Sequence, residues 1–112
     1  MKTVTQDFIS VIPSNDFGAI HIQKEVFTSI AYTACLDEKR AQLEALSKKP
    51  IHSVILDNEL ELSVEVKVHF GQNVNEVSES LQTKIAQTIE FMTGFRCKHI
   101  NIKVIGFEFN AQ

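Results

Sequence analysis

The clearest pattern in the chain is a strict alternation of apolar and polar residues over residues 60–70. The apolar members are Leu60, Leu62, Val64, Val66, Val68 and Phe70, and the polar ones between them are Glu61, Ser63, Glu65, Lys67 and His69. Because successive side chains of a strand point to opposite faces, the pattern predicts a strand with one buried face and one solvent face. Residues 53–56 read as a second strand, and Asp57 and Asn58 between the two favour a hairpin turn.

Two segments carry apolar residues at helical spacing. The first stripe consists of Val26, Phe27, Ile30, Ala31, Ala34 and Cys35, and the second of Val74, Val77, Leu81, Ile85, Ile89 and Met92. Asn73, with Glu76 three residues later, predicts an N-terminal cap for the second helix. Gly94 suits the left-handed residue that closes a helix. The sequence therefore predicts two amphipathic helices, the second marked at both ends.

The end of the first helix has two interpretations. Beyond Cys35 the apolar stripe becomes sparse and residues 37–49 are strongly charged. The helix either extends toward solvent or breaks near Asp37 into a second, shorter helix. Lys48, Lys49 and Pro50 end the segment in both cases, because proline cannot continue a helix and lysines favour the negative end of its dipole.

The N-terminal part of the chain is the least regular. Residues 1–17 have no sustained period and contain Pro13, Ser14, Asn15 and Asp16, which break regular structure. We predict a loosely ordered arm over residues 1–17, with a short strand near residues 8–12, and a single domain over residues 18–112. Residues 19–22 read as a short strand, since Ile20 and Ile22 lie on one side of it.

The last strand contains a slip in its alternation. Ile100, Ile102 and Val104 share one face, and His99, Asn101 and Lys103 share the other. Phe107 and Phe109 fall out of step with the first set, and Gly106 lies at the slip. The sequence predicts a bulge or bend there that returns both rings to apolar contact.

The order of these elements is strand, helix, strand, strand, helix, strand. It predicts an α+β fold, a two-layer sandwich with the helices on one face of a mainly antiparallel sheet. The split βαβ topology of ferredoxin-like domains is the simplest arrangement, and KH-like arrangements remain open.

Charge and cysteine content limit the function. The net charge of -3 and pI near 5.8 give no general attraction to nucleic acid or anionic lipid. Cys35 and Cys97 are far apart and lack metal-site spacing, which favours two reduced, buried thiols. No signal peptide and no apolar run long enough to span a bilayer is recognisable, so we expect a cytoplasmic protein.

Carboxylates and histidines are the first candidates for chemistry. Glu59, Glu61 and Glu65 share a strand face, but it is the predicted solvent face, where a carboxylate stays ionised. The four histidines lie on different predicted elements without metal-site spacing: His21, His52, His69 and His99. No phosphate-binding loop, nucleophile elbow or HExxH motif occurs. We therefore predict a non-enzymatic protein with no catalytic residue, metal or cofactor.

RNA binding is the main alternative, because RRM and KH domains present a sheet to RNA. Such sheets stack bases on aromatic side chains, whereas the outward face of the long strand here carries carboxylates and only one ring, that of His69. No GxxG loop is present. A small enzyme or ligand-binding domain is a third possibility.

Two stretches together resemble a known family. The matching residues are Ile20, Ile22, Glu25, Val26, Ile30 and Ala31, followed by Gly71, Asn73, Glu76, Val77, Met92, Thr93, Gly94, Asn101, Val104 and Gly106. They follow the patterns I-x-I-S-x-E-V-I-x-x-I-A, N-I-P-E-V, M-T-G and V-N-V-x-V-x-G of the alkaline shock protein family, small envelope stress response proteins found mainly in Gram-positive bacteria. The resemblance spans residues 18–107.

The resemblance implies a cytoplasmic scaffold or interaction protein of envelope stress and homeostasis, often self-associating and in some members held by an integral membrane anchor protein. Gln23 and Asn75 depart from the family serine and proline, and the charged residues 37–49 replace its usual Gly/Val-rich stretch. Two partner surfaces are candidates. One is the outward strand face with Glu61, Glu65, Lys67, Asn101 and Lys103, and the other is the charged segment 37–49. Exposed strand edges also permit pairing between subunits.

Overall fold

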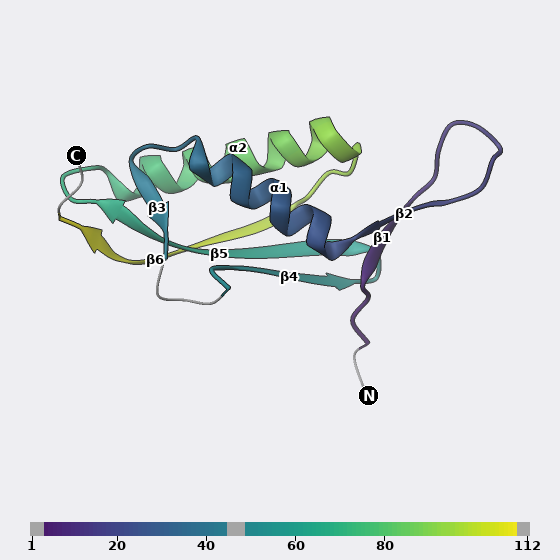
Figure 1. The fold of residues 1–112 in the computed structure, drawn as a ribbon, viewed down its shortest axis with the longest axis horizontal. Coiled ribbons are helices and arrows are strands. Elements are labelled where there is room, and N and C mark those ends of the chain that lie inside the picture. The colour runs from purple at the N-terminus through teal and green to yellow at the C-terminus, as the bar shows by residue number, and fades with distance from the viewer. Residues whose placement is uncertain (1–3, 45–48, 110–112) are drawn as a thin grey trace.

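The computed structural model describes residues 4–44 and 49–109 and confirms the α+β class. Within these residues the elements are β1 (Phe8–Val11), β2 (Ile20–Gln23), α1 (Lys24–Leu36), β3 (Ala41–Leu43), β4 (Ile51–Leu56), β5 (Glu59–His69), α2 (Val74–Thr93) and β6 (His99–Glu108). Both helices lie on the same side of the main sheet, which gives two layers (Figure 1). The predicted short strands near residues 8–12 and 19–22 are β1 and β2.

The central strand of the main sheet is β5. On one edge it pairs with β6, in parallel, from Glu61 to His69. On the other edge two antiparallel strands follow one another, β4 opposite the first half of β5 and β3 opposite its end. The pairing places the longest and most regular strand of the sequence at the centre of the fold.

The ferredoxin-like topology is wrong for this chain. In that topology the strands on either side of each helix are not neighbours, whereas β5 and β6 are joined by α2 and lie side by side. In addition, β2 pairs with β1 in a separate two-stranded sheet and does not enter the main sheet. Alternation of residues predicts which face of a strand is buried, but it carries no information about which strand lies next to it.

The predicted hairpin between β4 and β5 is confirmed. Asp57 and Asn58 have φ of 53° and 58°, the left-handed values that a two-residue type I′ turn requires. The Asn58 side chain also reaches the N-terminal hairpin: its Oδ1 accepts from the Ser10 N–H at 2.7 Å, and its Nδ2 donates to the Ser10 carbonyl at 3.1 Å. One turn residue therefore shapes the β4–β5 connection and connects it to β1.

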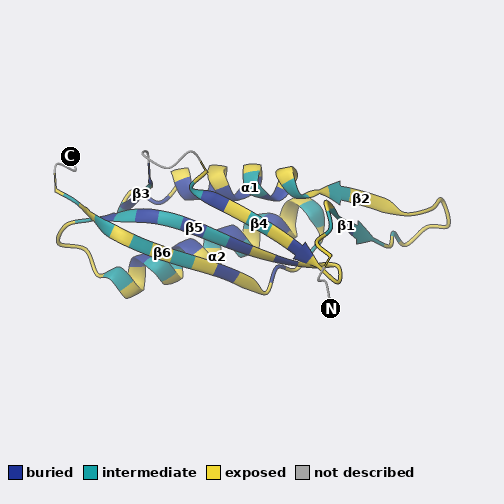
Figure 2. Ribbon diagram, turned by 90° about the horizontal axis from the view of Figure 1, so that it is seen from below, coloured by how far each residue is buried: buried dark blue, intermediate teal, exposed yellow. Residues whose placement is uncertain are grey.

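The core lies between the sheet and the two helices. The inward side chains of β5 are fully or almost fully buried: Leu60, Leu62, Val64, Val66 and Val68. Facing them are Phe27, Ile30, Ala31, Ala34 and Cys35 of α1 and Val77, Leu81, Ile85 and Ile89 of α2. Figure 2 shows the strands from below with alternating buried and exposed residues. The predicted helix stripes are thus confirmed in their central parts.

Three residues assigned to the apolar faces of the long strand and the two helices are exposed instead. Phe70 is 64% exposed and Met92 is 63% exposed. Phe70 lies one residue past the end of β5, and Met92 lies in the last turn of α2. Val26, 42% exposed, lies in the first turn of α1. Apolar periodicity therefore extends further along the sequence than the core does.

Both predicted ends of α2 are confirmed. The Asn73 side chain accepts from the backbone N–H of Glu76 at 3.0 Å. Gly94 has φ of 76° and donates its N–H to the Glu90 carbonyl at 2.8 Å. The side-chain acceptor and the left-handed glycine satisfy backbone groups that the helix ends leave without partners.

The first helix ends at Leu36, so the predicted break near Asp37 is confirmed. The second, shorter helix is wrong, because residues 41–43 form strand β3 against β5. Here Ala41 is buried and Leu43 half-buried while Gln42 is exposed, a period of two within the charged segment. The predicted end of the segment at Lys48 lies outside the described residues.

Part of the predicted N-terminal arm is attached to the domain. Strand β1 pairs with β2, and Ile9 is completely buried. The Gln6 N–H donates to the Ile55 carbonyl at the edge of β4 at 2.8 Å. The loop between β1 and β2 extends away from the body of the molecule (Figure 1).

The predicted bulge in β6 is confirmed. Val104 pairs with Val66 and Gly106 pairs with Lys67, so Ile105 is the extra residue. Phe107 then lies opposite the buried Val68. Three rings meet beyond this point: that of Phe70 is 5.7 Å from that of Phe107 and 4.8 Å from that of Phe109. The rings contact one another while remaining 41% to 69% exposed.

Candidate functional site

The five candidate partner residues lie together on one surface. Glu61, Glu65 and Lys67 point outward from β5, and Asn101 and Lys103 point outward from β6. The residues that alternate with them along each strand face the helices. The parallel register places Glu65 beside Lys103 and Ser63 beside Asn101. We call the outward side of β3, β4, β5 and β6 the open face, since no described element covers it (Figure 2).

The side chains of the open face differ in exposure. Glu61, Asn101 and Lys103 are exposed, whereas Glu65 and Lys67 are half-buried by their neighbours. The Lys67 Nζ lies 3.8 Å from the Glu44 Oε2, across the β3–β5 edge. Glu44 is itself only 9% exposed, so this ion pair belongs partly to the structure of the sheet edge. The more accessible charges are those of Glu61 and Lys103.

The structure adds residues to the open face that were not predicted. Three of the four histidines share it: His52 of β4, His69 of β5 and His99 of β6. Val54 and Leu56 of β4 also point outward and are 44% and 36% exposed. The alternation of residues 51–56 places these side chains on one face of β4. Which face that is becomes clear only once the register with β5 is known.

These histidines do not form a metal site. Within residues 4–44 and 49–109 there is no group of three or more histidine, cysteine or carboxylate side chains placed to hold a metal ion. The outward side chains of β3, β4, β5 and β6 include no phenylalanine or tyrosine, because Phe107 follows the inward parity and Phe70 lies past the end of β5. The open face therefore lacks the aromatic side chains that RRM-like sheets use to stack bases.

The second candidate surface, residues 37–49, is not a uniform solvated segment. Glu38 is only 4% exposed and holds several donors. Its Oε1 accepts from Arg40 Nε at 2.9 Å, and its Oε2 accepts from Arg40 Nη2 at 3.0 Å and from Ser80 Oγ at 2.8 Å. The Lys84 Nζ lies 3.5 Å from the same carboxylate. We call these four residues the Glu38 cluster.

The Glu38 cluster has a clear electrostatic consequence. Hydrogen bonds from Arg40 hold the pKa of the Glu38 carboxyl well below its usual range, helped by Ser80 and Lys84, while burial opposes them. The carboxylate stays ionised although it is buried. It joins the turn after α1 to α2, so the role seen here is structural. It was not predicted, because Ser80 is 42 residues from Glu38 in the chain.

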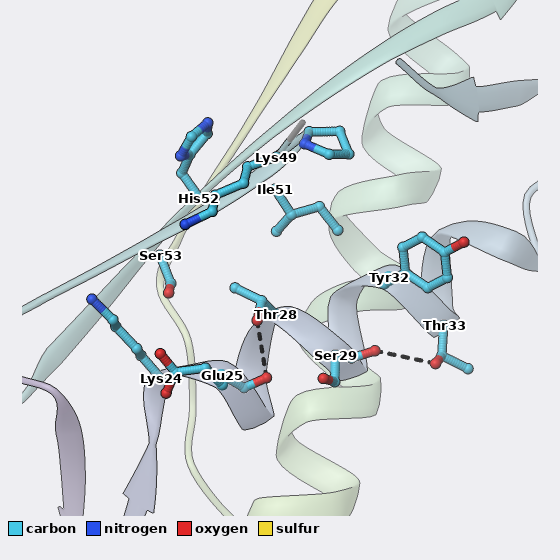
Figure 3. A pocket seen from close by; sticks show the side chains of 11 residues that line it. Lys24, Glu25, Thr28, Ser29, Tyr32, Thr33, Lys49, Ile51, His52 and Ser53 are labelled. Carbon is cyan, nitrogen blue, oxygen red and sulfur yellow. Dashed lines mark hydrogen bonds between the residues drawn. The ribbon is translucent and has the colours of Figure 1, made fainter. Parts of the chain in front are cut away.

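A hollow lies on another side of the molecule, between α1 and β4. Its volume is about 630 Å³, and Figure 3 shows its lining. The helix contributes Lys24, Glu25, Thr28, Ser29, Tyr32 and Thr33, and the strand side contributes Lys49, Pro50, Ile51, His52 and Ser53. We call it the α1–β4 groove. It was not predicted, because neither element shows it alone.

Both thiols are buried, as predicted. Cys35 is 5% exposed at the end of α1, and Cys97 is 7% exposed before β6. Burial raises the pKa of the Cys35 thiol to about 11, and it also raises that of Cys97.

The fold defines a class: a small two-layer α+β domain with two helices on one side of the sheet and an uncovered face on the other. Within that class the chain belongs to the alkaline shock protein 23 (Asp-23) family, which is described as having a cell envelope-related function and whose model matches residues 38–109. Comparisons with curated proteins and with solved structures find no match. Among the described residues, no helix is both long enough and apolar enough to cross a bilayer.

Proposed function

We propose that this chain is a non-enzymatic cytoplasmic scaffold that binds partner proteins in the envelope stress response and in cell-envelope homeostasis. Membership of a family with a cell envelope-related function supports the setting. The observation that carries the interaction role is the open face, a broad strand surface that no described element covers. A sheet that exposes one whole face beside a well-packed core has that face available for a partner.

The partner we propose is a cytoplasmic segment of an integral membrane anchor protein. On the described strands of the open face, Glu59, Glu61, Glu65 and Glu108 outnumber Lys67 and Lys103. Cytoplasmic segments of membrane proteins carry an excess of lysine and arginine, so their charge complements this face. Val54 and Leu56 add an apolar contact beside Glu61 and Glu59 in the register. Self-association through the same face is compatible with this role.

A pull-down from separated membrane and soluble fractions tests the proposal. The tagged chain is compared with a Glu61→Lys/Glu65→Lys variant, in which the central carboxylates of the open face are reversed. A Glu79→Lys/Glu90→Lys variant serves as the control, because both glutamates are exposed on α2, on the other side of the molecule.

We expect an integral membrane protein to be recovered with the wild type and the control but not with the open-face variant, and recovery to survive RNase. RNA recovered without a membrane protein would support the RNA-binding alternative, which no feature of the open face favours. Recovery with the wild type and with both variants would mean that the partner binds elsewhere.

A further inference from the structure

The α1–β4 groove contains a stretch of strand edge that no strand of the described residues pairs with. In the hairpin, the Glu65 N–H donates to the Pro50 carbonyl at 2.8 Å, which fixes the phase of the ladder. Residues 50, 52, 54 and 56 therefore turn their backbone groups toward β5, and Ile51, Ser53 and Ile55 turn theirs away from it. Among the described residues, no hydrogen bond engages the outward N–H or carbonyl groups of Ile51 and Ser53.

The same edge already accepts one residue of the chain itself. Gln6 forms an antiparallel bridge with Ile55, donating its N–H to the Ile55 carbonyl. The chain then turns away into β1, whose pairing with β2 draws it off the edge. Within residues 4–44 and 49–109, no residue continues the ladder that Gln6 begins over Ser53 and Ile51, which both line the groove.

The groove has a volume of about 630 Å³, which leaves room for side chains as well as a backbone. An extended peptide presents alternate side chains to opposite sides, so a strand added to β4 would direct every second one toward α1. There Thr28 and Tyr32 form the helical wall (Figure 3). This combination of a free strand edge and a neighbouring helix is what strand-addition recognition uses, with the backbone providing affinity and the pocket providing specificity.

Charge indicates which peptides would bind. Figure 3 shows Lys24 and Lys49 extending from the helix and from the strand side, with Ser53 between them. Among the described lining residues, Glu25 is the only carboxylate against Lys24 and Lys49, so the groove has an excess of positive charge on a molecule of net charge -3. The Lys24 Nζ lies 3.9 Å from the Asp7 Oδ1, a long contact to a side chain that is 88% exposed. Such a pair leaves the lysine available to a ligand.

We propose that the α1–β4 groove binds an extended, acidic segment of a partner protein, which adds to β4 as an antiparallel strand beside Ile51 and Ser53. The inference goes beyond the proposed function, because it assigns a second binding surface, of opposite charge to the open face. Its success or failure leaves the open-face proposal untouched, since the variants used below alter none of the carboxylates that carry it.

The test selects a displayed library of short random peptides on the full chain and measures the binding of the peptides that are enriched. We expect acidic, β-forming sequences, and on binding the amides of Ile51 and Ser53 should shift in NMR spectra and exchange more slowly with solvent. Reversing both lysines (Lys24→Glu/Lys49→Glu) should weaken binding by about tenfold or more, and added salt should weaken wild-type binding. Reversal of Lys103 on the open face serves as the control.

A proline at Ser53 tests the backbone pairing itself. Proline removes the outward N–H and is tolerated at such positions of edge strands, so Ser53→Pro should abolish binding while Ser53→Ala retains it. Two peptides N-methylated on alternate residues, one on the odd and one on the even positions, should differ. The one whose methyl groups replace the N–H groups that face β4 should not bind. Enrichment of no peptide, or shifts confined to the open face, would overturn the proposal. Slow exchange at Ile51 and Ser53 without peptide, lost on dilution, would overturn it in favour of a second copy of the chain.

Discussion

The hydroxyl of Ser80 donates to the carboxylate of Glu38 at 2.8 Å, and this contact joins the turn after α1 to the second turn of α2. Arg40 approaches the same carboxylate from within the turn, and Lys84 from one helical turn further along α2. The four side chains link the turn after α1 to α2. A buried charge with this many donors is retained as an ion because each of its oxygens is satisfied.

Removal of the Glu38 charge should therefore destabilise the fold. We expect Glu38→Gln to lower the free energy of unfolding by about 2 kcal/mol, since hydrogen bonds to a charged group are lost or weakened. Urea unfolding at neutral pH measures this. Glu79→Gln, at an exposed glutamate of α2, is the matched control and should change stability by less than about 0.5 kcal/mol.

The same cluster predicts a pH dependence with a definite sign. Because the pKa of Glu38 is lowered in the folded state, its contribution is fully present above about pH 4.5, the ordinary value for glutamate. It declines as the pH falls below that value toward the folded-state pKa. The difference in stability between the wild type and Glu38→Gln should thus be constant from pH 7 to 5 and shrink in acid. A difference that grows on acidification would contradict the assigned shift.

Structural features that depend on residues close together in the chain could be predicted from the sequence, and those that depend on distant residues could not. Alternation in β5, the Asn73 and Gly94 caps of α2 and the turn at Asp57 were predicted correctly, because each depends on residues close together in the chain. The strands that lie beside β5 were not predicted, because the alternation of apolar and polar residues in β5 is the same whichever strands pair with it. Strand β3 is only three residues long and lies within a strongly charged segment, so its alternation was not recognised.

The candidate surface was predicted to a similar extent. The outward parity of Glu61 and Lys103 could be read from each strand alone, and the register then brought them together. The burial of Glu38, the three histidines of the open face and the α1–β4 groove could not be predicted. Each arises from elements distant in the sequence, and only the packing of those elements creates it.

The side chain of Asn58 should control the stability of the N-terminal hairpin. Asn58→Gly keeps the left-handed turn but removes both hydrogen bonds to the Ser10 backbone. We expect the Ser10 amide to exchange about fivefold faster or more, since each such bond contributes about 1 kcal/mol. The neighbouring Asp57→Gly change should leave this rate unaltered. Equal exchange in both variants would mean that Ile9 burial alone holds β1.

Cys35 should be inert in the folded protein. Only the thiolate reacts with iodoacetamide, and a pKa raised to about 11 leaves little thiolate at pH 8. In a Cys97→Ala background, labelling should be slow in buffer and rapid in denaturant. Because the folded state holds this proton more tightly, the thiol contribution to stability is present below pH 9 and declines as the pH rises toward 11. Rapid labelling of the native protein would indicate opening at the end of α1.

The bulge in β6 predicts that one residue of this strand is dispensable. Ile105 is the extra residue between Val104 and Gly106, and it is 47% exposed. Its deletion leaves Gly106 opposite Lys67 and Phe107 opposite Val68, as in the wild type. We therefore expect deletion of Ile105 to change the free energy of unfolding by no more than about 1 kcal/mol, since it removes an irregularity rather than a core contact.

Deletion of Ile102 is the matched comparison. It also shortens β6 by one residue, but within the regular ladder, where a shift of one position moves every following side chain to the opposite face. Either Ile100 or Val104 must then leave the inward face, at a cost of about 2 kcal/mol or more for a large apolar side chain. Chemical unfolding of both variants separates the two cases. Equal destabilisation by the two deletions would mean that Ile105 itself supports the sheet. Retention of the Phe70–Phe107 ring contact in the Ile105 deletion alone would show that the bulge only determines which side chains of β6 face inward.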